Sequence, residues 1–103
     1  MIVISDTSAI TNLGAINQLI LLKQLYGKVF IPEAVYQELT SPSIAAGGRE
    51  AKEYEWIQVR SVSDRALVDE FLETLDIGES EAIVIAIELD ADLLLLDERQ
   101  ARE

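Results

Sequence analysis

Short apolar runs alternate along the chain with segments whose apolar residues recur at helical spacing. A run of valine, isoleucine or leucine bounded by polar residues is typical of a strand, and a run without polar alternation is typical of a strand buried on both faces. An apolar stripe at every third or fourth position predicts a helix instead. Strands are expected at residues 2–5, 29–31, 56–59 and 93–96, and helices from residue 9, between 17 and 27, and over 33–39, 49–55, 65–75 and 79–89.

Turn-forming residues mark several of these boundaries. Asn17 is a suitable N-cap for the helix that follows it, and Gly27 ends that helix as a C-cap glycine does. Pro32 favours the first turn of the next helix and restricts Ile31 to an extended conformation. Residues 77–78 are interpreted as a break before the last helix.

The strands and helices alternate in the order β-α-α-β-α-α-β-α-α-β, which predicts a mainly parallel sheet with helices on both faces. At 103 residues the chain is long enough for one core, so a single α/β domain over residues 1–103 is expected. The alternating pattern at 56–59 indicates an exposed or edge strand. The leucine run at 93–96 indicates a strand buried on both faces.

The composition excludes several classes of function. Half of the residues are hydrophobic, which argues against disorder, and the absence of cysteine excludes a disulfide framework and a thiolate metal site. The net charge of −11 argues against a non-specific nucleic-acid binder with a basic surface, unless carboxylates bind metal ions and reverse the local field. No run approaches the roughly 20 apolar residues that span a bilayer, so a cytoplasmic protein without membrane contact is expected.

Two aspartates end two of the predicted strands. Asp6 follows the run at 2–5, and Asp97 follows the run at 93–96. Because ligand-handling groups in parallel sheets lie just beyond the carboxyl ends of the strands, these carboxylates are expected at one edge of the sheet. They would repel each other unless a cation lay between them, and a divalent metal is the natural candidate.

Three glutamates are candidates to join them. Glu38 lies near the end of the helix opened by Pro32, and Glu79 and Glu81 lie in the first turn after Gly78. Each has an ordinary structural explanation, either as a solvated surface group or as a charge that complements a helix dipole. Taken together, hard oxygen ligands without histidine or cysteine suit Mg²⁺ or Mn²⁺, whose bound water is suited to phosphodiester hydrolysis.

Four motifs resemble a known family, the PIN domain, which is the metal-dependent ribonuclease fold of VapC-type toxins. Within it, the chain is similar to a poorly characterised prokaryotic PIN-like subfamily. The resemblance covers essentially the whole chain and implies a three-layer α/β/α sandwich with a central mainly parallel sheet. The motifs are Ile-Ser-Asp-Thr-Ser at 4–8, Ile-Pro-Glu-Ala-Val-Tyr-Gln-Glu-Leu at 31–39, Asp-Ile-Gly-Glu-Ser-Glu-Ala at 76–82 and Leu-Leu-Asp-Glu-Arg at 95–99.

The resemblance implies an endoribonuclease that hydrolyses RNA with Mg²⁺ or Mn²⁺. It assigns metal binding and catalysis to an acidic quartet, in which Glu79 is the alternative to Glu81. Glu81 is preferred because the segment Glu-Ala-Ile-Val-Ile-Ala that begins with it resembles the family's Asp-Ala-Leu-Ile-Ala-Ala pattern. Ser8 and Arg99 are expected near the substrate, and Glu98 beside the last ligand. The quartet is Asp6, Glu38, Glu81 and Asp97.

PIN domains usually continue past the last acid with a helix and another strand, whereas this chain ends at Glu103. A domain without those elements has an unpaired sheet edge, so a homodimer is expected. The alternative function is a catalytically weak or inactive PIN-like protein-binding module that takes a basic, antitoxin-like partner in a toxin–antitoxin pair.

Two phosphotransfer folds also place an aspartate after the first strand. Haloacid-dehalogenase-like phosphatases have Asp-x-Asp-x-Thr, but Ser8 stands two residues after Asp6. Receiver domains need paired acids after the first strand and a lysine after a later one, and neither is present. The RNA target, the cleavage specificity and the number of metal ions stay open.

Overall fold

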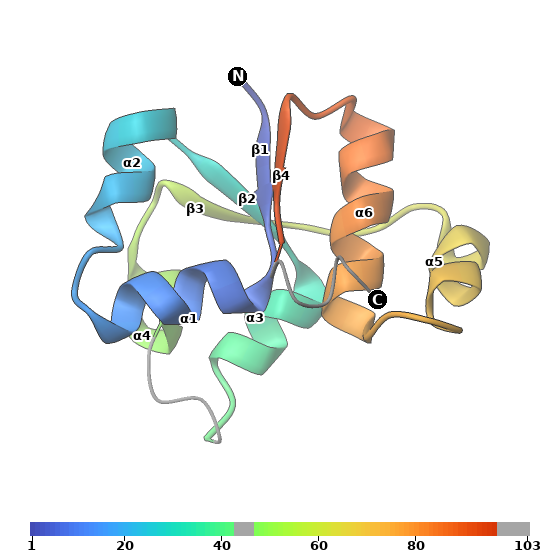
Figure 1. Ribbon diagram of the computed structural model, residues 1–103, viewed down its shortest axis with the longest axis horizontal. Helices are drawn as coiled ribbons and strands as arrows, with labels where there is room; N and C mark the ends of the chain where they lie inside the picture. Colours follow the sequence, from blue (N-terminus) through green and yellow to red (C-terminus); the bar gives the residue numbers. More distant parts are fainter. Residues whose placement is uncertain (43–46, 97–103) are drawn as a thin grey trace.

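The computed structural model describes residues 1–42 and 47–96. Its centre is a four-stranded sheet in the order β3-β2-β1-β4, with every neighbouring pair parallel (Figure 1). The strands are β1 (Val3–Ser5), β2 (Val29–Pro32), β3 (Ile57–Arg60) and β4 (Leu93–Leu95). The predicted parallel α/β architecture is confirmed.

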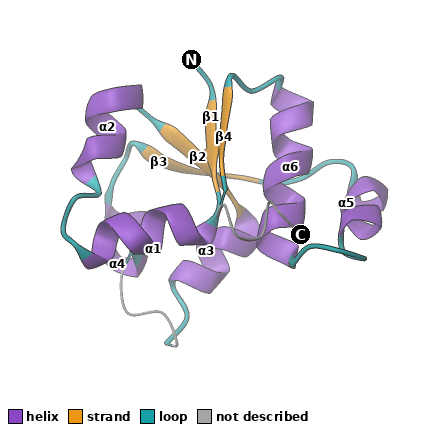
Figure 2. Ribbon diagram, viewed as in Figure 1, coloured by secondary structure: helices purple, strands orange, loops and turns teal. Residues whose placement is uncertain are grey.

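The described residues form six helices, two between each pair of successive strands (Figure 2). This is the predicted order of elements. The part of the chain that the structure describes contains no helix that is both long enough and apolar enough to span a bilayer. The helices are α1 (Thr7–Ala15), α2 (Ile20–Tyr26), α3 (Glu33–Leu39), α4 (Gly48–Glu53), α5 (Arg65–Phe71) and α6 (Ile77–Leu89).

The sheet separates two layers of helices. Successive strand residues point to opposite faces, so alternate positions enter different cores. Val3, Val29 and Ile31 pack with residues of α1, α2, α3 and α4, whereas Ile4 and Phe30 pack with α6. Helix α5 lies outside α6 and packs against it (Figure 1). The result is the three-layer sandwich of a PIN-like fold.

The parallel register brings the carboxyl ends of the strands to one edge. Ile4 pairs with Phe30 of β2 and with Leu94 of β4, and the Asp6 N–H donates to the Leu95 carbonyl oxygen over 3.0 Å. Asp6 therefore leaves the sheet beside the last residue of β4. Glu33 and Ser61, which follow β2 and β3, leave the same edge.

Three predicted helix starts are wrong. Helix α1 begins at Thr7 instead of residue 9, because the Asp6 side chain caps it. Asn17 is not an N-cap: it has a φ of 56°, and α2 begins later, after Leu19, without a side-chain cap. Residues 77–78 are not a break, because the Asp76 carboxylate accepts the Glu79 N–H over 2.8 Å and starts α6 at Ile77. At Asp6 and Asp76 a side-chain hydrogen bond decides where the helix starts, whereas α2 starts without one.

Among the C-terminal boundaries of the helices, the predicted end of α2 is confirmed and that of α5 is wrong. Gly27 ends α2 with a φ of 82°, so the predicted glycine cap is confirmed. Helix α5 ends at Phe71 instead of residue 75, because the chain forms a turn there. The Thr74 N–H donates to the Phe71 carbonyl oxygen, three residues earlier, over 3.1 Å. This leaves a short turn before Asp76.

The edge strands differ in how well they were predicted. Strand β3 is an edge strand, as its alternating pattern indicates, and Val59 is 40 % exposed. Strand β4 is not buried on both faces: it pairs with β1 alone among the described strands, and Leu93 is 37 % exposed. An apolar run does not distinguish a central strand from an edge strand.

Truncation of Ile4 is expected to destabilise the fold. This side chain is fully buried in the strand that delivers Asp6. Ile4→Ala should lower the free energy of unfolding by about 2–5 kcal/mol, because it leaves a cavity in the core. Urea unfolding followed by circular dichroism measures this change.

Ile16→Ala is the matched control. Ile16 is 63 % exposed at the end of α1, so the same chemical change should cost less than about 0.5 kcal/mol. Equal losses in the two variants would contradict the assignment of Ile4 to the core.

Candidate functional site

Asp6 begins the site at the carboxyl edge of the sheet. It follows β1 directly, is 2 % exposed, and its Oδ1 accepts the Ala9 N–H over 3.0 Å. This is the geometry of an N-cap, which satisfies one of the unpaired N–H groups in the first turn of α1. The carboxylate is thereby held in one orientation beside the end of β4.

A hydrogen bond from Thr7 holds Glu38 near the start of α1. Thr7, the first residue of α1, donates its hydroxyl to Glu38 Oε2 over 3.1 Å. Glu38 lies near the end of α3, and α1 and α3 are in contact. The structure thus brings the first two predicted acids to neighbouring positions, with Asp6 buried and Glu38 exposed.

The start of α6 stands against Glu38. A Cβ added to Gly78 would lie 3.6 Å from Glu38 Oε2 and 3.7 Å from Asp76 Oδ1. Both carboxylates therefore border the space that the glycine leaves open. Asp76 stood within a recognised motif but was not predicted as a site residue. Its position three residues before Glu79 was the available signal, because this spacing is typical of a cap.

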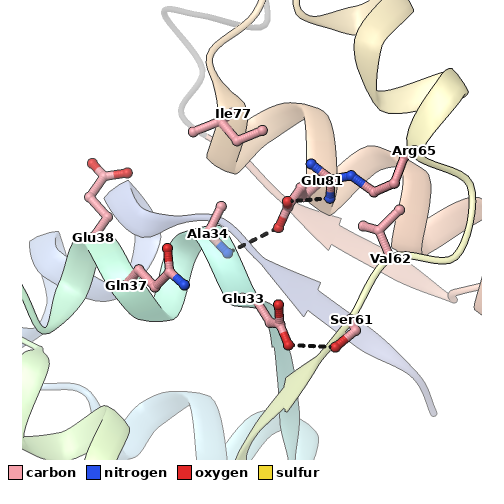
Figure 3. Close-up of a pocket in the computed structure, with 9 residues that line it drawn as sticks. All are labelled: Glu33, Ala34, Gln37, Glu38, Ser61, Val62, Arg65, Ile77 and Glu81. Carbon is pink, nitrogen blue, oxygen red and sulfur yellow. Dashed lines mark hydrogen bonds and ion pairs between the residues drawn. The ribbon is translucent and has the colours of Figure 1, made fainter.

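The carboxylate of Glu81 is buried and bonded through both oxygen atoms. Oε1 accepts the Ala34 N–H over 3.0 Å, and Oε2 lies 2.6 Å from Arg65 Nη1 (Figure 3). Glu81 is only 6 % exposed. Ala34 lies in the first turn of α3, where N–H groups have no partner within the helix, so a carboxylate is a favourable acceptor there.

Arg65 is the positive group beside Glu81. Their hydrogen bond raises the pKa of the Arg65 guanidinium; partial burial lowers that pKa, and the charges of Glu81, Asp69 and Glu33 raise it further. A group whose pKa is raised by folding stabilises the fold at every pH below its ordinary pKa. The pair therefore persists across the physiological range.

Glu38 and Glu81 line one open cleft of about 740 Å³. Arg65 forms part of the same wall as Glu81, and Glu33, whose Oε1 accepts the Ser61 hydroxyl over 2.6 Å, lies opposite (Figure 3). Among residues 1–42 and 47–96, three carboxylates and one guanidinium thus border the cleft. The described lining of the cleft is therefore mainly acidic, with the Arg65 guanidinium as its positive group.

The remaining predicted residues have different positions. Glu79 is 5 % exposed and, unlike Glu81, is not among the residues that line the cleft. Ser8 lies in the first turn of α1, where its carbonyl oxygen accepts the Thr11 hydroxyl over 3.2 Å. Three further predictions, Asp97, Glu98 and Arg99, lie outside the described residues.

The donor atoms suit a hard divalent cation, since every acid at this edge offers carboxylate oxygen. The open space beside Gly78, which a Cβ would fill, leaves room at Glu38 and Asp76. Within residues 1–42 and 47–96, however, no three acidic side chains are grouped closely enough to hold a metal ion. The described part of the chain therefore supplies suitable ligands without a complete metal site.

Sequence reasoning missed Arg65 as a site residue. It lies sixteen positions from Glu81 and on a different helix, so no local spacing links them. The only signal was the presence of a basic residue near the start of a helix that follows a strand, which is too common to be specific.

Comparisons with known proteins give one match. The model of a protein family described as a PIN domain matches residues 2–103, nearly the whole chain. No curated protein and no solved structure matches the chain significantly.

Removal of the Arg65 guanidinium is expected to destabilise the fold. Arg65→Met keeps most of the side-chain stem but leaves the buried Glu81 carboxylate without its charged donor. Because Arg65 is 56 % exposed, water replaces part of the interaction, and a loss of about 1–2 kcal/mol is expected in urea unfolding. The loss should be the same from about pH 6 to about pH 9, since Arg65 stays protonated.

Arg49→Met is the control for this change. Arg49 is 69 % exposed and pairs with Glu50 and Glu53 on the surface of α4, so its loss should be below about 0.5 kcal/mol. If both variants lost the same amount, Arg65 would be an ordinary surface charge.

Proposed function

Because the chain belongs to the PIN-domain family, whose members are generally nucleases, we propose that it is a metal-dependent endoribonuclease. The acids that would hold Mg²⁺ or Mn²⁺ are Asp6, Glu38, Glu81 and Asp97. One observation carries the proposal: Glu38 and Glu81, far apart in sequence, line the same cleft, and Thr7, the residue after Asp6, donates its hydroxyl to Glu38.

When bound, the metal ion would supply a water of lowered pKa and neutralise charge on the scissile phosphate. The protein's own groups hold the acids in place. Thr7 orients Glu38 through its hydroxyl, and the Ala34 N–H and the Arg65 guanidinium fix both oxygens of Glu81. Such outer partners set the orientation of ligands and typically change metal affinity or activity by about 10–100-fold.

The charge of the cleft predicts an order of binding. Without a metal ion, Glu33, Glu38 and Glu81 face an RNA phosphate, and among the described residues that line the cleft Arg65 alone offsets their charge. The protein as a whole carries a net charge of −11, so its long-range field also repels RNA. A divalent cation reverses the local charge, and RNA is therefore expected to bind well only in its presence.

A second candidate function, a PIN-like protein-binding module, is supported by apolar side chains on the surface. Leu25 of α2 is 69 % exposed and Leu93 of β4 is 37 % exposed. Exposed apolar side chains are suited to a protein partner, either a second copy of the chain or a basic, antitoxin-like protein. This candidate predicts binding without RNA cleavage.

Metal binding is tested first by thermal stability. Mn²⁺ at about 100 times its Kd should stabilise the native chain by about 2.7 kcal/mol, which raises the Tm by roughly 10–20 °C. Asp6→Asn should abolish the rise while keeping the N-cap, because asparagine caps helices as well as aspartate. No Mn²⁺-dependent rise in the wild-type chain would refute the metal site.

Cleavage is tested with a labelled single-stranded RNA in Mn²⁺. The wild-type chain should cleave it, and EDTA should stop the reaction. Asp6→Asn, Glu38→Gln and Glu81→Gln should each lower the rate about 100-fold or more, since each removes a proposed ligand. Glu70→Gln, an exposed charge on α5, is the control and should cleave normally. Metal binding without cleavage would favour the protein-binding module.

A further inference from the structure

Two cations share one aromatic ring on the sheet. Lys28 Nζ lies 5.4 Å from the centroid of the Phe30 ring, and Arg60 Cζ lies 5.5 Å from the same centroid. Phe30 belongs to β2 and is 9 % exposed, whereas Lys28 and Arg60 are exposed. A cation over an aromatic face is attracted by the ring quadrupole, which favours both positions. Two long basic side chains therefore approach the same ring.

Neither cation forms an ion pair with any residue that the structure describes. The arginines that do so are Arg49 and Arg65. With 19 acidic residues and 8 basic ones, carboxylate partners are plentiful on this protein. Two unpaired positive charges around one ring repel each other, and an anion bound between them would relieve that repulsion.

Arg60, one of the two cations, adjoins the proposed active-site cleft. Arg60 and Ser61 line a second hollow of about 510 Å³, and Ser61 also lines the cleft that contains Glu81. The two hollows therefore meet at Ser61. A phosphodiester chain with one phosphate in the cleft would pass Arg60 as it leaves over β3.

One carboxylate also lines the second hollow. Both oxygens of Glu88 accept the Ser63 N–H over 3.1–3.2 Å, and Oε2 accepts the Asp64 N–H over 2.8 Å. Hydrogen bonds from backbone N–H groups offset part of its negative charge. Glu88 therefore serves the turn before α5 and does not neutralise Arg60 by an ion pair.

We propose that Lys28 and Arg60, positioned by the Phe30 ring, bind a backbone phosphate of the RNA that flanks the cleaved bond. This inference rests on the proposed function. Phe30 is too buried to stack on a base, so its role is to position the two cations. Contacts of this kind position the RNA strand without reading its sequence. An acidic peptide is the competing ligand, but the junction with the cleft at Ser61 favours a continuous RNA strand.

The test measures binding of a fluorescein-labelled oligo(U) RNA to the full chain by anisotropy. Ca²⁺ replaces Mn²⁺, and intact RNA is verified after each titration. Lys28→Gln and Arg60→Gln should each weaken binding about 3–10-fold. Each should also reduce the slope of log K against log salt by about 0.7, the value for one lost contact with a single strand. Arg60→Lys, which keeps the charge, should keep the slope.

Lys52→Gln is the matched control. Lys52 is an exposed cation of α4 that contacts neither Phe30 nor the two hollows that meet at Ser61, so this equal loss of charge should leave the salt slope unchanged. Equal effects of Lys52→Gln and Arg60→Gln would overturn the site, because only overall charge would matter. Loss of poly-glutamate binding in the Lys28 and Arg60 variants, with RNA binding unchanged, would overturn it in favour of an acidic peptide.

The readouts also separate this site from the proposed nuclease activity. RNA binding that depends on Lys28 and Arg60, without any Mn²⁺-dependent cleavage, supports the phosphate site and refutes the nuclease. Cleavage that persists with an unchanged salt slope in both variants refutes the phosphate site alone. Absence of RNA binding by the wild-type chain refutes both.

Discussion

The buried carboxylate of Glu81 is the interaction on which the arrangement of the site depends. A charge that is only 6 % exposed must be compensated, and its two oxygens draw on different elements: the Ala34 N–H at the start of α3 and the Arg65 guanidinium at the start of α5. This ties α6 to the helices on either side of it. The wall of the cleft is thus built from three helix starts, where backbone N–H groups and side chains are both available as partners.

The parallel sheet supplies the other constraint. Since all four strands run in one direction, whatever follows a strand leaves at a common edge, and this edge collects Asp6, Glu33 and Ser61. Acids dominate there, which conflicts with an RNA substrate unless cations intervene. The structure offers two kinds of cation: Arg65 within the cleft, and Lys28 and Arg60 beside it. A divalent ion at the proposed ligands would complete the reversal of charge.

Much of the fold was predictable because its signals are local. Apolar periodicity placed the strands and helices in their correct order, and Gly27 marked the end of α2. The predicted start of α6 was wrong because one side-chain hydrogen bond decides it: the Asp76 carboxylate starts the helix two residues before the predicted position. The candidate acids Glu38 and Glu81 were also identified from the sequence, and both line the cleft.

The sequence by itself determined the order of elements, the parallel sheet and the carboxylate character of the candidate site, because periodicity and residue type do not depend on tertiary contacts. Only the tertiary structure decided which charges meet. Arg65 reaches Glu81 across sixteen positions, and Lys28 and Arg60 reach one ring from two different strands. It also decided that β4 lies at the edge of the sheet formed by the described strands, since strand order depends on how the helices pack on the sheet, which no apolar run records.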